Sequence, residues 1–141
     1  MFLGFFYTRQ RPSDEALFSS LSQMGIAASS VVWQKEWGDD AEISDFEGKT
    51  ILNVIEEDGT GFHFFILVRS IKDGDTFFNE ETVEDDCMTF AKSLAKNSGL
   101  DVVIDSGDYN PKVSPEGILT RVDLDDDTRE VVWESEIQML F

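Results

Sequence analysis

The 141-residue chain has a single cysteine, three prolines and no long apolar run. Because Cys87 has no partner within the chain for a disulfide, we expect a domain from a reducing compartment. No segment reaches the roughly 18 apolar residues that suggest a membrane-spanning helix. The apolar residues 1–7 are followed, not preceded, by Arg9 and Arg11, which is the wrong order for a secretory signal. The sequence therefore predicts a cytoplasmic protein.

Positive charge is also scarce. Eleven Lys and Arg residues stand against 29 Asp and Glu residues, for a formal net charge of -18. Because phosphate contacts require Lys and Arg, this balance argues against direct binding to nucleic acid or to an anionic membrane. It favours a basic protein as the partner. The alternative is that the acidic surface only keeps the protein soluble.

The acidic residues are concentrated in two parts of the chain, which we call the acidic segments: residues 36–60 and 101–141. Residues 36–60 hold nine acidic residues and one basic residue, and residues 101–141 hold eleven and three, so each segment carries -8. Residues 1–35 carry +1 and residues 61–100 carry -3. The charge that would attract a basic partner is therefore unevenly distributed.

The chain lacks the common catalytic motifs. It has no Gly-rich phosphate loop and no Ser in a G-x-S-x-G turn. Cys87 and His63 are its only thiol and imidazole, but Cys87 falls on an apolar helical stripe and His63 within a Phe-rich strand, where packing is their ordinary role. One Cys and one His also make a poor zinc site. We therefore expect no enzymatic activity, no metal and no cofactor.

Asp123, Asp125, Asp127 and Glu134 have the spacing of positions 1, 3, 5 and 12 of a helix–loop–helix calcium site. Thr128 stands where that loop requires Gly, and the flanking residues have the pattern of strands. A solvated hairpin tip is the better interpretation.

The periodicity predicts an α+β fold. Ser13 as N-cap and Gly25 as C-terminal stop define a helix over residues 13–24. A second helix runs from Thr82 to Gly99, and its apolar stripe consists of Val83, Cys87, Phe90, Ala91 and Leu94. The expected order is β-α-β-β-β-α-β-β-β, in one domain over residues 1–141 with a mostly antiparallel sheet and both helices on one face. The stretch around Asn110 and Pro111 is expected to be turns. The predicted strands cover residues 2–8, 31–37, 50–57, 62–71, 100–105, 117–124 and 129–134.

Strand 62–71 is apolar at successive positions, which predicts a central strand with both of its faces covered or nearly so. The tryptophans lie in strands beside acidic loops. Tryptophan usually packs in a core, but an exposed one framed by carboxylates would anchor an interface with a basic protein. Acidic residues 80–86 are explained by the positive end of the second helix, with a partner-facing patch as the alternative. The predicted partner-binding residues are Trp33, Trp37, Asp39, Asp40, Glu42, Asp45, Asp123, Asp125, Asp126, Asp127 and Trp133.

One part of the sequence is similar to a known class of proteins. Its features are Phe90 to Leu94, Gly99, Val102 to Asp105, Asn110-Pro111, Gly117 to Leu124 and Val131 to Trp133. This run resembles the C-terminal half of small acidic bacterial immunity proteins, which are encoded beside polymorphic or contact-delivered toxins. The resemblance implies an inhibitor that covers the active site of a basic toxin domain, which in some cases is a nuclease. A DNA-mimicking regulator of a nucleic-acid-binding protein is the alternative, and a small enzyme the third hypothesis.

Overall fold

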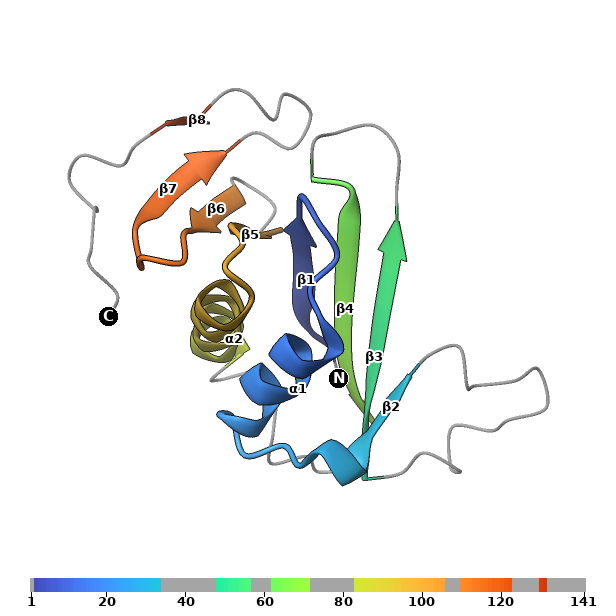
Figure 1. The fold of residues 1–141 in the computed structure, drawn as a ribbon. Coiled ribbons are helices and arrows are strands. Elements are labelled where there is room, and N and C mark those ends of the chain that lie inside the picture. The colour runs from blue at the N-terminus through green and yellow to red at the C-terminus, as the bar shows by residue number, and fades with distance from the viewer. Residues whose placement is uncertain are drawn as a thin grey trace.

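The computed structural model describes residues 2–33, 48–56, 62–71, 83–105, 110–122 and 130–131. In these ranges eight strands form one sheet in the order β2-β3-β4-β1-β5-β6-β7-β8, with two α-helices and one 3-10 helix, η1 (Figure 1). The helices are α1 (Asp14–Ser22), η1 (Ala28–Ser30) and α2 (Val83–Ser98). The strands are β1 (Phe2–Thr8), β2 (Val31–Trp33), β3 (Lys49–Glu56), β4 (Phe64–Ile71), β5 (Val102–Ile104), β6 (Asn110–Val113), β7 (Leu119–Val122) and β8 (Glu130–Val131).

The centre of the sheet is a split arrangement of strands. β1 pairs antiparallel with both β4 and β5, and β4 pairs antiparallel with β3. Together with α1 and α2, the strand order β3-β4-β1-β5 is that of a β-α-β-β-α-β unit. The short strand β2 adds to β3 in parallel. Both α-helices lie on the same side of the sheet (Figure 1), so the predicted α+β fold is confirmed.

One strand was missed by the sequence analysis. β6 lies in the stretch that we expected to be turns, and it pairs antiparallel with β5 and β7. Asn-Pro favours a turn because Pro cannot donate a backbone hydrogen bond. The ladder between β5 and β6 joins Val102 to Val113 and Val103 to Lys112, so Pro111 lies beyond its end and removes no bond from it.

The helix ends follow the expected local chemistry. Ser13 is the N-cap of α1, and its hydroxyl accepts a hydrogen bond of 3.1 Å from the Ala16 amide. Gly25 and Gly99 follow the two α-helices with φ of 85° and 71°, values that glycine adopts without strain. Within the described ranges, no helix is long and apolar enough to cross a membrane.

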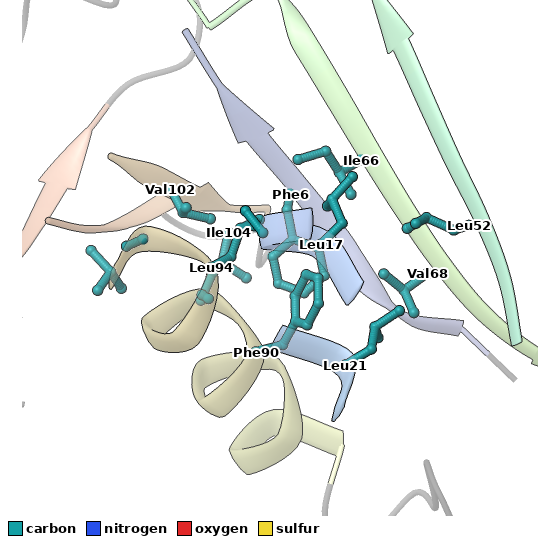
Figure 2. Packing of buried hydrophobic residues seen from close by; sticks show 14 of the residues in the cluster. Phe6, Leu17, Leu21, Leu52, Ile66, Val68, Phe90, Leu94, Val102 and Ile104 are labelled. Carbon is teal, nitrogen blue, oxygen red and sulfur yellow. The ribbon is translucent and has the colours of Figure 1, made fainter. Parts of the chain in front are cut away.

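The core fills the space between the helices and the sheet (Figure 2). Phe6 of β1 is its centre, with a ring 4.8 Å from that of Phe90 of α2 and tilted by 55°. Ile66, Val68 and Leu52 cover the same face of the sheet on β4 and β3, and all are fully buried. The predicted apolar stripe of α2 is therefore confirmed. Its buried residues are Phe90, Ala91, Leu94 and Ala95.

Two buried threonines on this face differ in their hydrogen bonding. The Thr8 hydroxyl donates to the Gln10 carbonyl over 2.6 Å, whereas the Thr50 hydroxyl has no hydrogen-bond partner. Both side chains are at most 1% exposed. On folding, the Thr50 hydroxyl loses its hydrogen bonds to water and forms none within the protein, which destabilises the folded state. Valine has the same shape without the hydroxyl, so we expect Thr50→Val to raise the free energy of unfolding by about 1 kcal/mol.

Thr8→Val is the matched control, since it removes a hydroxyl that does have a partner. It should lower the free energy of unfolding by about 1 kcal/mol. Urea denaturation of both variants measures the difference, and equal effects of the two substitutions would contradict this prediction.

Candidate functional site

Of the predicted partner-binding residues, Trp33 is the one in the described ranges. It ends β2 and is half-buried. The others lie outside the described residues: Trp37, Asp39, Asp40, Glu42, Asp45, Asp123, Asp125, Asp126, Asp127 and Trp133. The residues with the spacing of a calcium loop, Asp123, Asp125, Asp127 and Glu134, also lie outside the described residues.

Trp33 lies at the edge of the core. Its ring makes an edge contact with that of Phe18, with centroids 5.8 Å apart, and packs against the main buried cluster. The guanidinium of Arg11 lies 5.6 Å from the centroid of the Trp33 ring. Trp33 is therefore packed on one side by Phe18 of α1 and on another by Arg11, which precedes α1.

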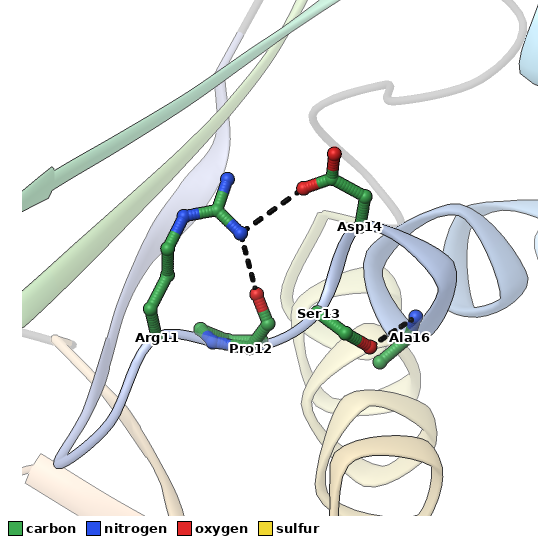
Figure 3. Close-up of polar contacts among 5 residues, drawn as sticks. All are labelled: Arg11, Pro12, Ser13, Asp14 and Ala16. Carbon is green, nitrogen blue, oxygen red and sulfur yellow. Dashed lines mark hydrogen bonds and ion pairs between the residues drawn. The ribbon is translucent and has the colours of Figure 1, made fainter.

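Arg11 is positioned by the start of the same helix (Figure 3). Its Nη1 donates to the Pro12 carbonyl over 2.8 Å and forms an ion pair of 3.0 Å with Asp14. Both side chains of the ion pair are about half exposed, at 44% and 57%, so the pair adds little stability. Its effect is to hold the guanidinium beside Trp33.

A second apolar surface lies on the opposite face of the sheet, away from α1 and α2. We call it the rear patch, and it consists of Phe5, Tyr7, Ile55, Phe65 and Leu67. Side chains alternate along a strand, so these residues point away from the core that holds Phe6 and Ile66. The pairing places Phe5 opposite Leu67, and Phe65 between Tyr7 and Ile55. The five side chains are therefore neighbours across three adjacent strands.

The rear patch is ordered and partly open to solvent. Phe5 stacks on Phe65 with centroids 5.5 Å apart and an interplanar angle of 14°, and Tyr7 contacts Phe65 at 5.1 Å. Phe5 is 37% exposed and Ile55 is 39% exposed, while the other three are half-buried. In strand 62–71, which was predicted to be covered on both faces or nearly so, Ile66 and Val68 on the helix side are fully buried, and Phe65 and Leu67 on this side are half-buried.

One end of the rear patch continues into a small buried cluster of Phe62, Val103 and Tyr7. Phe62 is 2% exposed, and the Arg9 guanidinium lies 4.2 Å from its ring centroid. The Arg9 guanidinium therefore makes a cation–π contact with Phe62 at this end of the sheet.

The rear patch lies on β1, β4 and β3, and the next strand beside β1 is β5. β3 belongs to residues 36–60 and β5 to residues 101–141, and both flank the central pair β4-β1. Glu56 follows Ile55 and is exposed, but it pairs with Phe64, so the alternation places its side chain on the helix side of the sheet. Asp105 is also exposed, and its amide donates to the Phe5 carbonyl over 3.0 Å. Arg69 also belongs to this face, opposite Ile51.

Cys87 and His63 are far apart. The Cys87 sulfur lies beside Gly4, where an added Cβ would be 2.7 Å from Sγ. Gly4 pairs with Val68, whereas His63 precedes β4 and is exposed. Val68 is five residue steps along the chain from His63, which in extended backbone is about 16 Å. The structure therefore does not bring this thiol and imidazole together.

Lys112 is the buried charge of the described sheet, at 6% exposure. Its Nζ forms an ion pair of 3.5 Å with Asp101, which precedes β5. Such a pair compensates the loss of water around the ammonium group. In the part of the chain that the structure describes, no group of three or more His, Cys, Asp or Glu side chains could hold a metal ion.

The sequence analysis missed the rear patch because β1 and β4 are apolar at successive positions, a pattern typical of fully covered strands. The signal that could have located it is the pair of aromatic residues Phe5 and Tyr7, which alternate with Phe6 in β1. No family model, curated protein or solved structure matches this chain.

Proposed function

We propose that this chain is a non-catalytic inhibitor that binds a basic toxin domain and covers its active site. The observation that supports this most directly is the net charge of -18 on a well-packed α+β domain. Negative charge at this density speeds encounter with a cationic surface and repels nucleic acid and anionic membranes.

The resemblance to bacterial immunity proteins supports the same function, since those proteins act by occluding a toxin active site. Binding by occlusion needs a rigid surface and no catalytic groups. The sheet presents such a surface, because its central strands are held from one side by a fully buried core.

The proposal is tested by capture and neutralisation. Tagged protein is incubated with lysate of its source cell at low salt and again at high salt, and the bound proteins are identified by mass spectrometry. We expect one basic protein that is released at high salt. Expressed alone, that protein should arrest growth, and co-expression of this chain should restore it.

Two results would contradict inhibition. One is that the captured protein still arrests growth when it is co-expressed with this chain. The other is that no basic protein is captured at low salt. If the captured protein binds DNA, and duplex DNA competes with this chain for it, then DNA mimicry is the correct function.

A further inference from the structure

We draw no further inference here: the strongest candidate, the rear patch on β1, β4 and β3, is an apolar face of the sheet that also carries Arg69 and Asp105, charges of opposite sign, and nothing in the described residues shows what covers it.

Discussion

Phe90→Ala is expected to lower the free energy of unfolding by about 3–5 kcal/mol. Phe90 is fully buried, and its ring packs against that of Phe6 between α2 and the centre of the sheet. Truncation removes apolar contacts and leaves a cavity that the surrounding strands and helix cannot fill. Urea denaturation followed by circular dichroism measures the loss, which should also lower Tm by about 10 °C or more.

Phe5→Ala is the matched control for this truncation, because it removes the same atoms from the other face of the same sheet. Phe5 is 37% exposed, so less apolar surface returns to water and no closed cavity forms. We expect a loss of about 1–2 kcal/mol, from packing on Phe65 and from strand propensity. If Phe5→Ala destabilised the protein as much as Phe90→Ala, the rear patch would be part of the core and not an open surface.

The second large effect is expected at Gly4. A Cβ at this position would lie 2.7 Å from the Cys87 sulfur, which is closer than two such atoms approach in proteins. We therefore expect Gly4→Ala to lower the free energy of unfolding by about 1–3 kcal/mol, through the shift forced on α2 or on the thiol.

A double-mutant cycle isolates this contact. With Cys87→Ala in place the obstacle is gone, and Gly4→Ala should become neutral or stabilising by up to about 1 kcal/mol, because alanine has less freedom to lose than glycine. The sign of the Gly4→Ala effect should thus depend on residue 87. If Gly4→Ala destabilises the protein equally in both backgrounds, the thiol does not fill this space. The same cycle tests whether Cys87 is a packing residue.

Much of the fold was predictable from local patterns. Ser13 and Gly25 bound the first helix as expected, because capping and positive φ are properties of single residues. The apolar spacing of Phe90, Ala91 and Leu94 identified the buried face of α2. β6 was missed because the tendency of Asn-Pro to form turns was overridden by pairing with β5 and β7, which lie on either side of it.

The candidate site was less predictable. Trp33 was chosen as an anchor for its residue type, yet it is half-buried against Phe18 at the edge of the core. Phe5 and Ile55 were not chosen, since nothing in their sequence neighbourhood distinguishes an open face from a covered one. Their exposure depends on where the two helices pack, which is decided by contacts between distant parts of the chain.

By itself the sequence determined the charge of this protein, its division into two helices and a set of strands, and its two acidic segments. These properties depend on composition and on short-range periodicity. Only the tertiary structure decided that β4 and β1 lie side by side between strands of the two acidic segments. Long-range strand pairing is the reason, since Phe5, Ile55 and Phe65 become neighbours only when three separate segments align in one register.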